Sequence, residues 1–190
     1  MTSSKPEILQ QTVTAESRLF KLERLQLRFG NGEERQFERI CGKAAGGAVM
    51  IVPLLNADTV LLIREYGAGI GDYVLGFPKG AVAAGEDLLQ TANRELLEET
   101  GYGAGRLTVL CQFSASPSYF NSMMHLVLAE DLYTVAERPP GDEPELLTAI
   151  PWRLDQIDQL LQQPEFHEAR SIAALLLLER RLRFAAASEC

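Results

Sequence analysis

The sequence predicts an α/β fold in which a mixed β-sheet is covered by helices. Strand-like segments rich in Val, Ile and Leu fill the first two-thirds of the chain, one helical pattern lies in the middle, and helical segments close it. The chain has 190 residues, of which 46% are apolar, so it can bury a core and carry a small appended subdomain. We expect that subdomain at residues 1–45 and the main domain at residues 46–190.

The first part of the chain predicts two groups of strands. Residues 1–16 are polar and are expected to form a loose lead. Residues 18–29 and 34–40 are strand-like and are joined at Gly30, Asn31 and Gly32, residues that tolerate the positive φ of a tight hairpin. These two segments predict a small N-terminal antiparallel sheet. Three further strands are expected at residues 46–55, 59–66 and 73–77.

A helix is predicted at residues 88–100. Asp87 is the expected N-cap, Gln90 three positions later completes a capping-box pattern, and Gly101 ends the helix. The remaining elements are strands at residues 107–113, 125–129 and 146–152, then helices at 154–161 and 165–184 separated by Pro164.

Composition excludes several classes of function. The formal net charge of −8 disfavours a nucleic-acid partner, since Lys and Arg must neutralise phosphates there. Cys41, Cys111 and Cys190 are scattered and indicate neither disulfides nor a zinc site. The polar N-terminus does not resemble a signal peptide, and the apolar runs are too short to cross a bilayer. We therefore expect a cytoplasmic protein without a membrane partner.

Three glutamates on the predicted helix indicate a metal-binding site. Glu95, Glu98 and Glu99 are spaced i, i+3 and i+4, so they project from one face and repel one another unless a cation lies among them. Hard oxygen ligands suit Mg²⁺ or Mn²⁺, which polarise phosphoryl oxygens and lower the pKa of a bound water. A solvated acidic surface is the alternative, with Arg94 simply paired to Glu98.

The residues around these glutamates favour a metal site over a solvated acidic surface. Apolar residues supply the other side of the helix, so the acidic side is a separate face, and Gly80 and Gly85 bracket a loop whose backbone can approach a cation. The whole segment resembles the Nudix box. Its fixed positions are matched at the correct spacing by Gly80, Glu86, Arg94, Glu95, Leu96, Glu98, Glu99 and Gly101, with Tyr102 a mild variant in the last apolar place.

The resemblance implies a fold and a set of ligands. The fold would be the Nudix α/β/α sandwich. Glu95, Glu98 and Glu99 would bind the metal together with the backbone carbonyl of Lys79 or Gly80. Arg94 would orient them by pairing with Glu86 or another carboxylate of the box. Among these residues, Arg94, Glu98 and Glu99 would also belong to the catalytic machinery.

Features outside the box resemble the ADP-ribose pyrophosphatase branch of the family. Pro117 lies sixteen residues past Gly101, as in that branch, although a plain loop turn is the alternative. The N-terminal strands resemble the extra sheet through which those enzymes form homodimers and complete each other's adenine pockets. Arg64 and Arg39 would then contact substrate, the alternative for both being a surface arginine. Pro117 is included with them as a substrate-binding residue.

A second acidic cluster lies at residues 141–145. As a plain feature it is a polar turn before a strand. In the resembled branch this place carries a catalytic glutamate and a further metal ligand, so Glu143 is the expected base and Glu145 the expected ligand, with the two interchangeable. A carboxylate on such a loop can activate the attacking water.

The chain also resembles the NudE-type group of bacterial ADP compounds hydrolases. Val74 departs from that group, which more often has glutamate there. The resemblance implies Mg²⁺-dependent hydrolysis of ADP-ribose, NADH and diadenosine di- or triphosphate, releasing AMP. The alternatives are a nucleoside triphosphate or dinucleoside polyphosphate hydrolase and a non-catalytic nucleotide-sensing module. The shared stretches cover residues 17–20, 76–80, 92–96, 117–120 and 168–170.

Overall fold

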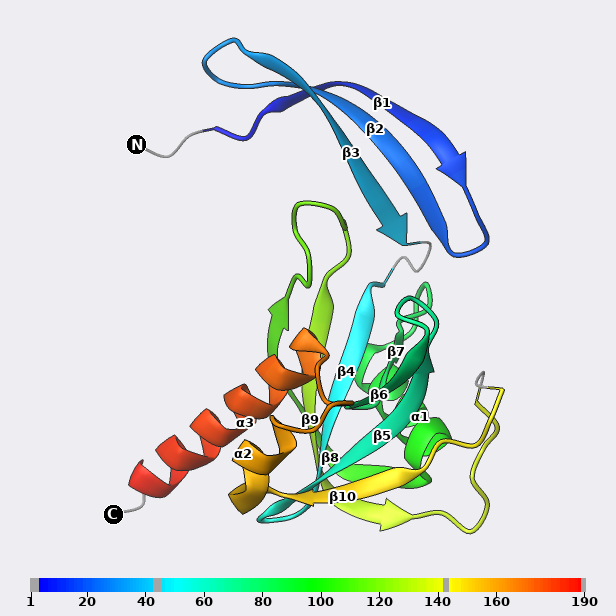
Figure 1. Cartoon of the computed structure of the whole chain (residues 1–190), viewed down its shortest axis with the longest axis vertical. Coiled ribbons are helices and arrows are strands. Elements are labelled where there is room, and N and C mark those ends of the chain that lie inside the picture. Colours follow the sequence, from blue (N-terminus) through cyan, green and yellow to red (C-terminus); the bar gives the residue numbers. More distant parts are fainter. Residues whose placement is uncertain (1–3, 43–45, 142–143, 189–190) are drawn as a thin grey trace.

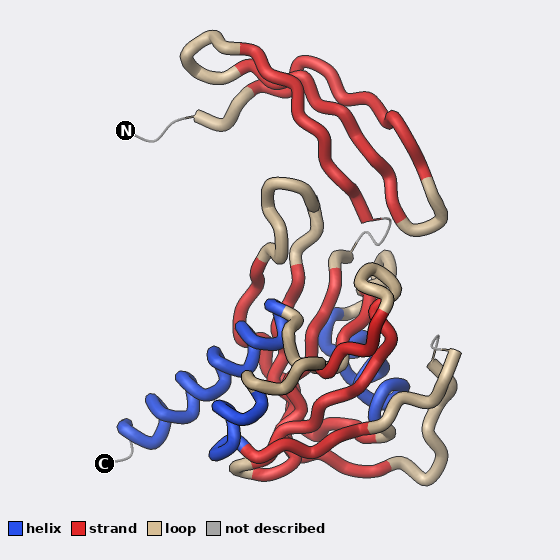
Figure 2. The backbone as a smooth tube through the Cα atoms, in the orientation of Figure 1, coloured by secondary structure: helices blue, strands red, loops and turns tan. Residues whose placement is uncertain are grey.

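The computed structural model describes residues 4–42, 46–141 and 144–188. These residues form two β-sheets and three α-helices (Figures 1 and 2). The elements are β1 (Glu7–Glu16), β2 (Phe20–Arg28), β3 (Glu34–Gly42), β4 (Ala48–Asn56), β5 (Thr59–Gly67), β6 (Asp72–Gly76), β7 (Lys79–Ala81), α1 (Leu88–Thr100), β8 (Tyr102–Phe113), β9 (Met124–Thr134), β10 (Ala149–Arg153), the 3-10 turn Leu154–Gln156, α2 (Ile157–Leu160) and α3 (Ala169–Ser188).

The main sheet is mixed, as the sequence predicts. Its strands run in the order β10-β5-β4-β9-β8, and β6 and β7 add to it by pairing with β5 and β4 respectively. The central strands β4 and β9 are parallel, and the other pairs are antiparallel. Because β7 pairs with β4 at residues 79–81, the chain segment just before α1 is fixed to the middle of the sheet.

Helices cover both faces of this sheet. Successive residues of β4 face opposite sides: Met50 packs with α3, whereas Val49 and Ile51 pack with Ala92 and Leu96 of α1. All five of these side chains are fully buried. In Figure 1, α2 and α3 accordingly lie on one side of the sheet and α1 on the other. This arrangement confirms the α/β/α sandwich.

The N-terminal sheet has three strands rather than two. The prediction of a loose polar lead over residues 1–16 was wrong, because β1 pairs antiparallel with β2 along nearly its whole length. Its sequence gave no alternation of apolar and polar residues, since the strand is exposed on both sides and is held by backbone hydrogen bonds. The sheet joins the main domain where the Ile40 N–H donates to the Tyr119 carbonyl at 2.7 Å.

Other departures follow from tertiary contacts. Strands β8 and β9 run longer than predicted because they pair with each other along their lengths. Residues 165–168, predicted as helix, instead lie beside β6, where the Leu75 N–H donates to the Glu165 carbonyl at 2.9 Å. The predicted helix at 154–161 is a 3-10 turn followed by the short helix α2. In the described part of the chain, no helix is both long and apolar enough to cross a membrane.

Candidate active site

Helix α1 places the glutamates on its last two turns. The Asp87 carboxylate caps its start by accepting the N–H groups of Leu89 and Gln90 at 3.0 and 3.1 Å, as predicted. Gly101 ends it with a left-handed φ of 79°, and its N–H donates to the Leu97 carbonyl. Both ends of the helix are therefore fixed by local sequence.

Arg94 gathers the carboxylates around one guanidinium. Its Nε and Nη2 donate to the two oxygens of Glu86 at 3.0 and 3.2 Å. Its Nη1 lies 2.8 Å from Glu95 and 3.2 Å from Glu98. These hydrogen bonds lower the pKa of Glu86 to about 2 and raise that of Arg94. The predicted pairing of Arg94 with Glu86 is therefore present, and Arg94 also pairs with Glu95 and Glu98.

The backbone of strand β7 lies close to Glu99 and also to Glu95. The Lys79 N–H donates to Glu99 Oε2 at 3.1 Å, and Glu99 is only 2% exposed. A Cβ atom on Gly80 would lie 1.9 to 2.3 Å from the carboxyl atoms of Glu95, so a glycine is required for this close approach. The backbone at Lys79 and Gly80 thus lies beside Glu99 and Glu95, and the ligating role of one of its carbonyls stays a prediction.

The side chain of Lys79 extends the charged cluster to β5. Its Nζ lies 2.6 Å from Glu65 Oε2. Glu65 stands directly opposite Val74 in the β5–β6 register, and facing residues of an antiparallel pair lie on the same side of the sheet. A glutamate at position 74 would therefore lie beside Glu65, which is itself a carboxylate on this face of the strand pair.

The second acidic cluster is only partly described. Glu143 lies outside the described residues, so its proposed role as base stays a prediction. Glu145 accepts a hydrogen bond from the Tyr73 hydroxyl at 2.9 Å, which raises the pKa of Tyr73. Glu145 and Glu98 line the same cavity of about 470 Å³, which lies between the end of α1 and the loop that contains Glu137 and Glu145. The two acidic clusters therefore share one hollow.

The two predicted substrate arginines are engaged within the protein. Arg64 forms a two-point ion pair with Glu165 at 2.7 and 2.8 Å and lies 3.9 Å above the Tyr73 ring. Arg39 pairs with the buried Glu23 at 2.8 Å on the N-terminal sheet. Both contacts are intramolecular anchors, and the substrate-binding roles of these arginines stay predictions.

Pro117 lies in the turn that connects the two sheets. The N–H groups of Tyr119 and Phe120 both donate to the Ser116 carbonyl, which closes the turn around Pro117. Residues 119–121 then bond to Ile40 at the end of β3. Pro117 therefore lies in the loop that contacts the N-terminal sheet, and its role in substrate binding stays a prediction.

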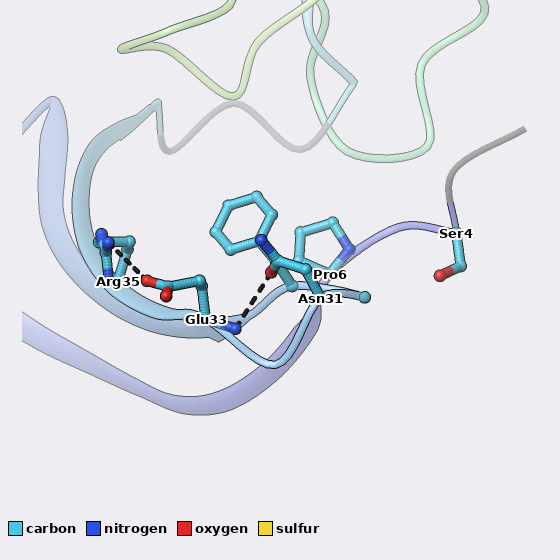
Figure 3. A pocket seen from close by; sticks show the side chains of 7 residues that line it. Ser4, Pro6, Asn31, Glu33 and Arg35 are labelled. Carbon is cyan, nitrogen blue, oxygen red and sulfur yellow. Dashed lines mark hydrogen bonds and ion pairs between the residues drawn. The ribbon is translucent and has the colours of Figure 1, made fainter.

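The sequence missed three residues near the carboxylates. Glu65 and Tyr73 lie on adjacent strands whose pairing was not predicted, and Arg138 bonds to a helix 40 residues away. A second hollow, at the tip of the β2–β3 hairpin, contains none of these residues (Figure 3). It is lined by Ser4, Pro6, Phe29, Gly30, Asn31, Glu33 and Arg35, and the figure shows it beside an Arg35–Glu33 ion pair.

The chemical type of these donors suits a divalent metal ion. Carboxylates of α1 and backbone carbonyls of β7 are hard oxygen donors, the type that Mg²⁺ and Mn²⁺ prefer. Within residues 4–42, 46–141 and 144–188, no three His, Cys, Asp or Glu side chains stand in a geometry that could hold a metal as they are. The Arg94 guanidinium lies between the carboxylates and provides their positive counter-charge.

Carboxylates clustered at a helix end, beside a glycine-bearing strand on a mixed sheet, are donors suited to an enzyme that hydrolyses a phosphoanhydride with the help of a divalent metal. Two family models match the chain: the NudE-type Nudix hydrolase N-terminal domain at residues 6–39 and the NUDIX domain at residues 45–176. The chain belongs to the Nudix hydrolase family, whose members generally use divalent metal cations.

Relatives within the family are similar over most of the chain. The ADP compounds hydrolase NudE of Escherichia coli (strain K12) is 46% identical over 179 residues, covering 94% of each chain. The ADP-ribose pyrophosphatase of Bacillus subtilis (strain 168) is 29% identical over 133 residues, covering 70% of this chain and 72% of the relative. A crystal structure of an ADP compounds hydrolase superposes with a TM-score of 0.87 at 44% identity, covering 97% and 98% of the two chains.

Proposed function

We propose that this protein hydrolyses the pyrophosphate linkage of ADP conjugates and releases AMP. The substrates to be expected are ADP-ribose, NADH and diadenosine di- or triphosphate. The observation that carries the proposal is the 46% identity to an ADP compounds hydrolase through both the N-terminal sheet and the main domain. Glu95, Glu98 and Glu99 of α1 are all present, and Arg94 pairs with Glu86, Glu95 and Glu98, which favours a working hydrolase over a nucleotide-sensing module.

The residues of the site divide into four roles. Glu95, Glu98, Glu99 and Glu145 would hold Mg²⁺ with the backbone carbonyl of Lys79 or Gly80, and Mn²⁺ would also suit these donors. Bound there, the ion would polarise the phosphoryl group and lower the pKa of a water. Arg94 orients three carboxylates, Glu143 would take the proton of the attacking water, and Arg64, Arg39 and Pro117 would bind substrate.

A homodimer through the N-terminal sheet belongs to the same proposal. One face of this sheet carries Ile8, Val13 and Phe37, which are 45–54% exposed and pair with Leu27, Glu23 and Leu25 of β2. An apolar face left exposed on a sheet marks an interaction surface, and a second copy of the chain would cover it. We expect a dimer by light scattering and a shift toward monomer in the Phe37→Asp variant. A monomeric wild-type protein would contradict this part.

Steady-state hydrolysis tests the activity and the metal assignment together. ADP-ribose, NADH, diadenosine triphosphate and dGTP are compared with and without Mg²⁺. Glu99→Gln keeps an oxygen to accept the Lys79 N–H but loses the charge, so we expect activity to fall by at least about 100-fold. Glu179, a glutamate of α3 that forms an ion pair with Arg183, is the matched control, and Glu179→Gln should retain activity.

The outcomes separate the candidate functions. Preferential turnover of dGTP would favour a nucleoside triphosphate hydrolase. Binding of ADP-ribose without turnover of any substrate would favour the sensing module. Near wild-type activity in Glu99→Gln would show that the metal assignment is wrong.

A further inference from the structure

One side chain, Arg138, joins the last turn of α1 to the acidic loop. We define this loop as residues 137–147, of which 137–141 and 144–147 are described. The Arg138 Nε donates to the Glu98 carbonyl at 2.7 Å, and its Nη1 donates to the Leu147 carbonyl, also at 2.7 Å. Leu147 is 4% exposed, so the second contact is made where the loop rejoins the core. A single guanidinium therefore connects a helix and a loop.

The end of α1 uses this contact as a cap. The last carbonyls of a helix have no partner within it, and the last turn of α1 contains no basic residue. Gly101 supplies an N–H to the Leu97 carbonyl, and Arg138 supplies one to the Glu98 carbonyl. The Arg138 stem lies against Gly101, since a Cβ atom there would be 3.6 Å from the Arg138 Cδ. The turn that carries Glu98 and Glu99 is thus capped by a distant residue.

The same side chain ties the two ends of the acidic loop. Arg138 lies near its start and Leu147 at its end, so their hydrogen bond closes the base of the loop. Further out, Glu145 accepts from Tyr73 at 2.9 Å. Arg138, Glu145 and Glu98 all line the cavity between the loop and α1. The loop is therefore held at its base and at Glu145.

We propose that Arg138 is a positioning residue for hydrolysis. The two N–H donors of its guanidinium hold the base of the acidic loop beside the last turn of α1. They thereby fix the position of Glu145 relative to Glu98 and Glu99. This inference rests on the proposed function, because it requires the loop to act in the reaction. The Glu98 and Leu147 carbonyls need two donors on one rigid plane, which a guanidinium supplies and a lysine ammonium does not.

The test compares Arg138→Ala and Arg138→Lys with Arg153→Ala. Arg153 is a matched control because its ion pairs with Asp58 and Asp155 lie at the surface, at the end of β10. We expect Arg138→Ala to lower kcat for ADP-ribose about 10- to 100-fold with little change in KM. Lysine should not restore kcat, whereas added guanidinium ion should partly restore it in the alanine variant, and methylammonium should not.

Amide hydrogen exchange supplies a readout that does not depend on activity. In the full-length protein without substrate, Arg138→Ala should exchange faster at residues 97–101 and 144–147, while β4 and β9 keep wild-type protection. Equal acceleration throughout the chain would overturn the inference, because Arg138 would then be a general stabiliser. Wild-type kcat in the alanine variant, or full kcat in the lysine variant, would overturn it as well. If the wild type hydrolyses no ADP conjugate, the proposed function fails, but the exchange result still decides whether Arg138 couples the two elements.

Discussion

Replacing Gly80 by alanine separates the geometry of the site from the stability of the fold. A Cβ atom at this position would lie 1.9 Å from the Glu95 Cδ, whereas ordinary contact begins near 3.4 Å. The carboxyl group must therefore move by about 1.5 Å. The φ of Gly80 is not in the left-handed region, so alanine can adopt the same backbone. The substitution thus acts on the Glu95 side chain.

The size of the effect follows from that displacement. A misplacement of about 1 Å in a catalytic group can lower the rate by about 100-fold, equivalent to about 2.7 kcal/mol. The clash is with the end of a flexible side chain, so we expect the free energy of unfolding to change by less than about 1 kcal/mol. Activity and stability should therefore respond very differently.

Two measurements check this prediction. Urea denaturation gives the free energy of unfolding, and Mg²⁺-dependent turnover of ADP-ribose gives kcat/KM. Gly69→Ala is the control, because a Cβ there meets nothing within 4 Å and its φ is also outside the left-handed region. Wild-type kcat/KM in Gly80→Ala would refute the requirement for Glu95 at its observed place. A loss of more than about 3 kcal/mol of stability would show instead that the β4–β7 pairing resists the added methyl group.

Two further predictions concern charged groups. The pKa of Glu86 is lowered from 4.5 to about 2 by Arg94, so its contribution to stability is complete above about pH 4.5 and is lost as the pH falls toward 2. Thermal unfolding of Glu86→Gln should therefore depend less on pH in that range, and parallel curves would contradict this. Glu23→Ala leaves the half-buried Arg39 without its carboxylate and should destabilise the N-terminal sheet by about 1–3 kcal/mol, seen as faster hydrogen exchange in β1–β3; unchanged exchange would oppose it.

Several parts of the fold were predictable because their signals are local. The helix α1 was placed from Asp87 to Gly101, since a cap, an apolar face and a left-handed glycine lie within one segment. The central strands were found from their runs of Val, Ile and Leu. The strand β1 was missed because a polar edge strand has no periodicity to detect, and its existence depends on pairing with β2.

The candidate site divides in the same way. Glu95, Glu98 and Glu99 share a helix face, and Arg94 is close to them in sequence, so spacing alone placed them together. The contact of Arg94 with Glu86 needs only a short loop. In contrast, Arg64 was expected to face substrate, and the structure joins it to Glu165, which is 101 residues away. No local pattern carries information about such a partner.

By itself the sequence determined the carboxylate helix, its caps and the class of chemistry that follows from them, because these depend on residues within a few turns of one another. Only the tertiary structure decided what surrounds that helix. The pairing of β7 with β4 brings Gly80 against Glu95, the register of β5 and β6 sets Glu65 opposite Val74, and folding of the acidic loop brings Arg138 to the end of α1. These contacts join residues far apart in the chain, and their geometry arises only when the sheet and its loops pack together.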